Sequence, residues 1–197
     1  MPFVLAMAFM LLTGIAVVME PYFAGDVAVT RAIQSVASNP ERWATPVSRL
    51  APAPGKYFVM AIVLTASFFI GGWRGLALLV GFLLLEQYGA ESTKAIFKRP
   101  RPSPELITTF GKFTGYTFPS TTITFFSVTF GALGILAMVR KNAPMRVPVM
   151  AISFFMVFLG AIARVALGAH WPSDVVLTAL ICMVWIWAAS RVVLGKG

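Results

Sequence analysis

The stretch TITFFSVTFGALGILAMV, residues 122–139, contains no charged side chain and is the clearest of several such runs. The other uncharged runs cover residues 2–19, 57–73, 75–85, 147–163 and 175–190. A helix needs about 20 mostly apolar residues to cross a bilayer. The run 75–85 is short, but it continues at helical spacing through Glu86 and Glu91 toward residue 97. The sequence therefore predicts an all-α integral membrane protein with six transmembrane helices in one bundle.

The composition agrees with this class, because 58% of the 197 residues are hydrophobic and soluble domains average about 45–50%. We expect a single domain over 1–197, with a core over 57–190 and an extramembrane or interfacial segment over 20–56. Residues 2–19 have no basic region before them and no small-residue cleavage site after them, so we favour a retained span over a signal peptide. The single Cys182 excludes an intramolecular disulfide. Oligomeric state is left open.

Charge predicts the orientation. With six spans both termini lie on one side, which receives six cations and no acid: Arg74, Arg140, Lys141, Arg146, Arg191 and Lys196. Five cations of the opposite side belong to candidate site motifs, namely Lys94, Lys98, Arg99, Arg101 and Arg164. Setting these aside leaves the terminal side richer in basic residues, so we expect it to be cytoplasmic. The opposite side then faces the periplasm of a bacterial inner membrane. Although the chain is basic, its predicted membrane-spanning helices argue against nucleic acid as a partner.

A first polar motif, Lys94-x6-Arg101-Pro102, follows the third predicted span. If the helix continued, Lys94, Lys98 and Arg101 would lie on one face. A basic collar at a membrane surface is an alternative reading. Two prolines alternating with two arginines favour a fixed geometry instead.

A second motif, Phe118-Pro119-Ser120-Thr121-Thr122, opens the fourth span. Ser and Thr before an apolar run are typical helix N-caps. The free N–H groups of such a first turn can also bind an anion. Capping alone is the better explanation of the motif when it is taken in isolation.

The third motif is Arg164-x5-His170-x3-Asp174, which contains the only histidine of the chain. A nucleophilic imidazole needs a carboxylate that orients the ring and a cation that holds an anionic substrate. One helical turn separates Asp174 from His170, so we expect the carboxylate to reach a ring nitrogen. A polar loop with a structurally satisfied histidine is the alternative.

Taken together, the three motifs resemble the type-2 phosphatidic acid phosphatase superfamily of membrane lipid phosphatases, over roughly residues 57–190. The resemblance implies a six-helix fold whose site faces the outer leaflet, and a reaction through a phosphohistidine without metal or cofactor. It further implies that His170 attacks phosphorus and Asp174 polarises it. The phosphate oxygens would be held by Lys94, Arg101, Ser120, Thr121 and Arg164.

The chain departs from the family pattern at the second motif. Thr122 stands where the family has a histidine that protonates the leaving oxygen, and Thr121 replaces a glycine. A threonine cannot act as a general acid near neutral pH. Three explanations fit: a substrate with a good leaving group such as a diphosphate, a site that binds lipid phosphate with weak or no turnover, or an engineered replacement.

The sequence thus predicts dephosphorylation of a lipid phosphate or polyprenyl diphosphate, with the bilayer and that lipid as its partners. Transfer of the phosphoryl group to another lipid is one alternative. A catalytically weakened or inactive phospholipid-binding protein is the other.

Overall fold

A computed structural model describes residues 20–142 and 145–195, the isolated positions 4, 8, 12, 14 and 15, and all side chains in these ranges except those of residues 90 and 91. The elements of the continuous ranges are all helices: α2 (Asp26–Val36), α3 (Pro40–Ser48), α4 (Gly55–Phe97), α5 (Thr121–Phe126), a π-helical turn η1 (Ser127–Gly131), α6 (Ala132–Val139), α7 (Arg146–Ala166) and α8 (Pro172–Val193). The prediction of an all-α protein is confirmed for these residues. The predicted first span, 2–19, falls almost wholly outside them.

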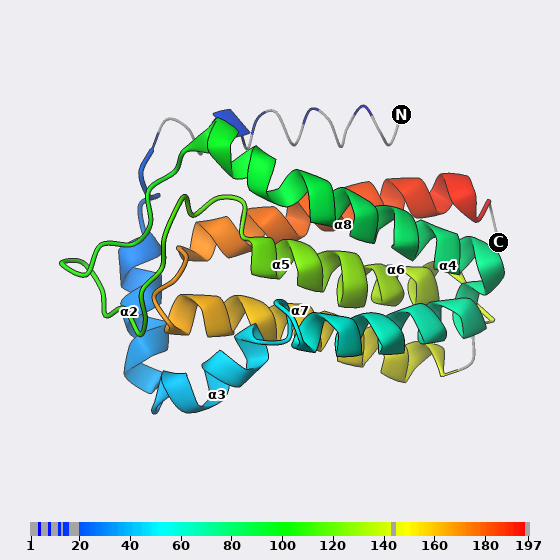
Figure 1. Ribbon diagram of the computed structural model, residues 1–197, viewed down its shortest axis with the longest axis horizontal. Helices are drawn as coiled ribbons and strands as arrows, with labels where there is room; N and C mark the ends of the chain where they lie inside the picture. The colour runs from blue at the N-terminus through cyan, green and yellow to red at the C-terminus, as the bar shows by residue number, and fades with distance from the viewer. Residues whose placement is uncertain are drawn as a thin grey trace.

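Four helical segments are long and apolar enough to cross a membrane: 55–89 within α4, the continuous run 121–139, α7 and α8. The 43 residues of α4 would extend about 65 Å if straight, about twice the thickness of the hydrocarbon core. Instead α4 breaks at Gly72, whose φ of 63° and ψ of −158° suit only glycine. Its first arm (55–71) lies beside α3 and α7, and its second arm (73–97) returns along the side of α8 (Figure 1). This break agrees with the predicted boundary between the second and third spans.

The run α5–η1–α6 is the centre of the bundle. In its most apolar window 78% of the residues are buried, against 28–33% in the other three candidate spans. Close packing at Gly160 of α7 explains part of this, because a Cβ there would lie 2.4 Å from the ring of Phe126. The central helix therefore holds its N-terminus in a fixed position relative to α7 and α8.

One end of the bundle carries α2, α3 and the long connection 98–120, while the α4 hairpin bend lies toward the other end (Figure 1). Within the predicted extramembrane or interfacial segment 20–56, residues 26–36 form helix α2. The connection 98–120 packs on the turn after α7, where Phe110 N donates to Leu167 O at 2.9 Å. Gly168 has φ of +69°, and a Cβ there would lie 2.3 Å from Thr108 O, so only glycine fits. This contact fixes the turn that carries His170.

Candidate active site

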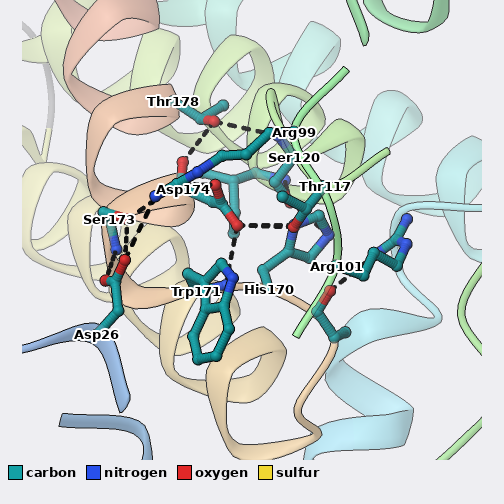
Figure 2. A network of polar contacts seen from close by, with 12 residues as sticks. Asp26, Arg99, Arg101, Thr117, Ser120, His170, Trp171, Ser173, Asp174 and Thr178 are labelled. Carbon is teal, nitrogen blue, oxygen red and sulfur yellow. Dashed lines mark hydrogen bonds and ion pairs between the residues drawn. The ribbon is translucent and has the colours of Figure 1, made fainter. Parts of the chain in front are cut away.

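The three sequence motifs meet at this end of the bundle. His170 lies in the turn between α7 and α8, Asp174 in the first turn of α8, and Ser120 at the N-cap of α5 (Figure 2). All three side chains are at most 1% exposed. The structure thus places three polar groups, two of them ionisable, in the interior, where each requires a polar partner.

A threonine hydroxyl links the histidine to the carboxylate. Thr117 Oγ1 lies 3.0 Å from His170 Nδ1 and donates to Asp174 Oδ2 at 2.6 Å. The direct distance from Nδ1 to Oδ2 is 3.9 Å, too long for a hydrogen bond. The expectation that Asp174 itself reaches the ring is therefore wrong, because Thr117 occupies the space between them.

This link decides which ring nitrogen is free. The Thr117 hydroxyl has one proton, which it gives to Asp174, so it accepts from His170 Nδ1–H. The tautomer assigned in this way leaves the lone pair on Nε2, which lies 3.3 Å from Ser120 Oγ. Nε2 is consequently the nitrogen that can attack an electrophile.

Asp174 is held by a buried network that motif reasoning did not foresee. Trp171 N donates to Asp174 Oδ2 at 2.9 Å, so the carboxylate caps the start of α8. Arg99 Nη1 forms a short, buried ion pair with Asp174 Oδ1. Arg99 Nη2 also lies 3.4 Å from Asp26 Oδ2. The Arg99 side chain thus bridges two buried carboxylates.

Asp26 connects this network to the N-terminal segment. It starts α2, and its carboxylate accepts from Ser173 N at 2.9 Å and from Ser173 Oγ at 2.6 Å. Arg99 itself is positioned by Thr117, whose backbone N donates to Arg99 O at 2.9 Å. The interfacial segment and the connection 98–120 therefore both support the histidine.

The N-terminus of α5 is tied to the first turn of α8. The Ser120 side chain accepts from Ile123 N at 3.5 Å, as expected of an N-cap. Ser120 N donates to Thr178 Oγ1 at 3.1 Å, and Thr178 Oγ1 donates to Asp174 O at 2.6 Å. Capping and anion binding are compatible here, because the N–H groups of the helix's first turn remain directed toward the histidine end of the bundle.

Three of the predicted cations surround this helix start. Lys94 Nζ lies 3.5 Å from Thr121 Oγ1. Arg101 Nη1 donates to Ala169 O at 2.7 Å, beside His170 in sequence. The guanidinium groups of Arg101 and Arg164 lie 5.9 and 5.2 Å from the centroid of the Phe113 ring. Lys94, Arg101 and Arg164 are therefore placed around one space.

Lys98 does not join this group. Helix α4 ends at Phe97, and Lys98 is an exposed residue in the left-handed conformation, with φ of 51°. The helix does not continue to Arg101, so Lys94, Lys98 and Arg101 do not share a helix face. Pro100 explains the early end, because proline disfavours a helical conformation in the residue before it.

The cations and the burial act together on the histidine. Burial lowers the pKa of His170 well below its ordinary value of 6.5, and the positive charges of Arg164, Arg101 and Lys94 lower it further. A hydrogen bond to the Thr117 backbone opposes this shift. The imidazole is therefore neutral at neutral pH, which is the form that can act as a nucleophile.

A cavity of about 400 Å³ opens onto one of these cations, Arg164. Its lining includes Arg164, Thr121 and Thr122, together with Glu86 from the second arm of α4 and Arg49 after α3. A second space, an apolar groove of about 740 Å³, is lined by Glu86, Pro119, Val128, Ile181 and Trp185, among others. Glu86 contributes to both.

Comparison with known proteins gives the family. The PAP2 superfamily model matches residues 75–197, which include all three motifs. The chain belongs to the PAP2 superfamily. No curated protein sequence matches it.

Two solved structures share the fold. The PAP2-type phosphatidylglycerolphosphate phosphatase of Bacillus subtilis aligns over 95% of this chain and 93% of its own, with 19% identity and a TM-score of 0.71. Aquifex aeolicus LpxE aligns over 86% of this chain and 96% of its own, with 22% identity and a TM-score of 0.65. These alignments support the arrangement of helices that brings the motifs together.

Proposed function

We propose that this PAP2 superfamily member is a membrane lipid phosphatase that works through a phosphohistidine on His170. The observation that carries the proposal is the chain of contacts from Asp174 through Thr117 to Nδ1, which leaves Nε2 free among three cations. Phosphoryl transfer depends mainly on positioning and on stabilising charge. Three cations and a helix N-terminus supply that charge without a metal ion.

In this proposal Lys94, Arg101 and Arg164 hold the phosphate oxygens, together with Ser120, Thr121 and the N–H groups at the start of α5. Nε2 of His170 attacks phosphorus, and the bond to the leaving oxygen breaks. The ring becomes positive, and the Asp174 carboxylate stabilises that charge through the Thr117 hydroxyl. Water then attacks phosphorus and releases phosphate from Nε2.

The lipid nature of the substrate is supported by the apolar groove beside Pro119, which accommodates alkyl chains next to the cationic site. A lipid phosphate or a polyprenyl diphosphate fits this combination. One fold neighbour is named a phosphatidylglycerolphosphate phosphatase, so a glycerophospholipid with a terminal phosphate monoester is the first substrate to test. We further propose that residues 2–19 form the first of six spans in one bundle. We also propose that the site faces the periplasm of a bacterial inner membrane.

The test uses the purified chain, with a tag that contains no histidine, in detergent with a chelator. We expect phosphate release from a lipid phosphate, and acid-labile, base-stable phosphorylation of the protein. Because the chain has one histidine, loss of this phosphoramidate in His170→Asn would assign it to His170 rather than to a lysine. His170→Asn should lose about 10⁴-fold or more in kcat. Full activity of this variant would refute the mechanism, and a phosphorylated lipid product would indicate phosphotransfer instead.

A second candidate is a phospholipid-binding protein with weak or no turnover, which Thr122 favours. Binding of a lipid phosphate without release of phosphate would support it. Thr122→His should then confer hydrolysis.

A further inference from the structure

The second motif has Thr122 where the family resemblance places a histidine, and the cavity that Thr122 lines also contains a carboxylate. Among the described residues that line the 400 Å³ cavity, Glu86 is the only carboxylic acid. Thr121, Thr122 and Arg164 line the same cavity. Glu86 comes from a different helix, the second arm of α4, and therefore stands outside every motif of the family.

Glu86 is held in place by a lysine. Lys56 Nζ lies 3.0 Å from Glu86 Oε2 and donates to Gln87 Oε1 at 2.7 Å. The two charged side chains are only 18% and 10% exposed. Lys56 begins the first arm of α4, and its ammonium lies 5.5 Å from the ring centroid of Phe125 on the central helix. The Lys56–Glu86 pair therefore connects the two arms of α4 and lies next to α5.

An ion pair at membrane depth is costly to place, so a functional role is the first explanation to test. Simply joining the two arms of α4 is the alternative. A contact that only joined the two arms would not require the Glu86 carboxylate to line a cavity. That cavity is also lined by Thr122 and by the half-buried Arg164. The Arg164 Nε has no hydrogen-bond partner among the described residues.

We propose that Glu86, with Lys56 as its proton source, is the catalytic group that protonates the leaving oxygen in place of the missing histidine. The inference rests on the proposed function. The inference also specifies the substrate class. With Glu86 as the proton donor, the chain hydrolyses lipid monophosphates, whose leaving group is an alkoxide that needs a proton.

The proton balance closes over two steps. Lys56 Nζ gives a proton to Glu86 Oε2, and the carboxyl group passes a proton to the leaving oxygen as its bond to phosphorus breaks and the Nε2–P bond forms. In the second step the Glu86 carboxylate takes a proton from the attacking water as the new P–O bond forms and the Nε2–P bond breaks. That proton returns to Lys56, and both groups regain their starting charges.

The experiment compares leaving groups. Glu86→Gln and Lys56→Met are assayed on a long-chain alkyl phosphate, on 4-nitrophenyl phosphate and on a polyprenyl diphosphate. Removal of a general acid typically costs about 10²–10⁴-fold. We expect a loss of at least about 10²-fold on the alkyl phosphate and less than about threefold on the other two, whose leaving groups need little protonation. Thr122→His in the Glu86→Gln background should restore alkyl phosphate hydrolysis.

Glu41→Gln, which changes an exposed glutamate on α3, is the matched control and should leave all three rates unchanged. An equal loss on all three substrates would assign Glu86 a structural role and overturn the proposal. So would an unchanged alkyl phosphate rate, or the selective loss appearing in Glu91→Gln instead. If Glu86→Gln does not fold, Lys56→Met carries the same comparison. A wild-type chain that hydrolyses none of the substrates would instead refute the proposed function, and the inference with it.

Discussion

The two sides of the candidate site are built differently. The nucleophile side consists of Asp26, Arg99, Thr117, His170 and Asp174, and each of these side chains is at most 4% exposed. The cavity side consists of Lys56, Glu86, Thr121, Thr122 and Arg164, all of them partly exposed. Hydrogen bonds and ion pairs join all members of the first side, whereas the second contains a buried Arg164 Nε without a hydrogen-bond partner among the described residues. The His170 side chain is thus held in place by the protein's own contacts, while the cavity side keeps a polar atom available to a ligand.

The largest effect is expected from Arg99→Met, which breaks the nucleophile side at its centre. Asp174 and Asp26 would remain buried without their cation, and an uncompensated buried charge costs about 3–5 kcal/mol of unfolding free energy. Thermal unfolding in detergent measures this loss. Arg42→Met, at an exposed position on α3, serves as the control. Equal melting temperatures for the two variants would show that the network is not a source of stability.

A smaller effect is expected from Thr117→Val, which keeps the shape of the side chain and removes the bridging hydroxyl. We expect kcat to fall by about 10²-fold, less than the ~10⁴-fold loss typical when an orienting carboxylate itself no longer holds its histidine. The reason is that Nδ1 loses its acceptor and the ring can adopt the other tautomer. Nitrogen-15 NMR of the single histidine reports the tautomer directly. Thr117→Ser retains the hydroxyl and should behave like the wild type; a Val variant with normal tautomer and rate would remove Thr117 from the mechanism.

The smallest effect concerns pH. Burial and the positive charges of Arg164, Arg101 and Lys94 hold the pKa of His170 well below 6.5, against the opposing bond with Thr117. Between the folded pKa and 6.5 the unfolded chain binds the additional proton, so unfolding free energy falls as pH drops through that window. The single imidazole should stay neutral at pH 6 by NMR. Arg164→Met should raise its pKa, and a midpoint at or above 6.5 in the wild type would contradict the electrostatic account.

Much of the fold and part of the candidate site could be predicted from the sequence. Uncharged runs placed the apolar spans, and the break at Gly72 falls where Arg74 separates two of them. His170, Asp174 and Ser120 lie together because short motifs at helix ends fix their positions. Spacing alone could not place Lys98, because helix α4 ends at Phe97, ahead of Pro100.

Thr117 and Asp26 were missed for another reason. Neither has a local signal, since a threonine in a proline-rich connection and an aspartate at a helix start are common features. Asp26 meets Ser173 across 147 positions of the chain, and only tertiary packing brings them together. Glu86 was recognised as a membrane-embedded acid, but its place in the cavity depends on the return path of the second arm of α4.

The Thr178 hydroxyl connects α5 to α8: it accepts from Ser120 N and donates to Asp174 O. This connection does not pass through the imidazole. The phosphate cradle at the start of α5 and the carboxylate at the start of α8 therefore keep their mutual alignment when His170 is replaced. Under the proposed function, a His170→Asn chain should accordingly act as a substrate trap: it should keep the contacts that hold a lipid phosphate while lacking the nitrogen that attacks it, and it can be used to capture the physiological lipid from membranes.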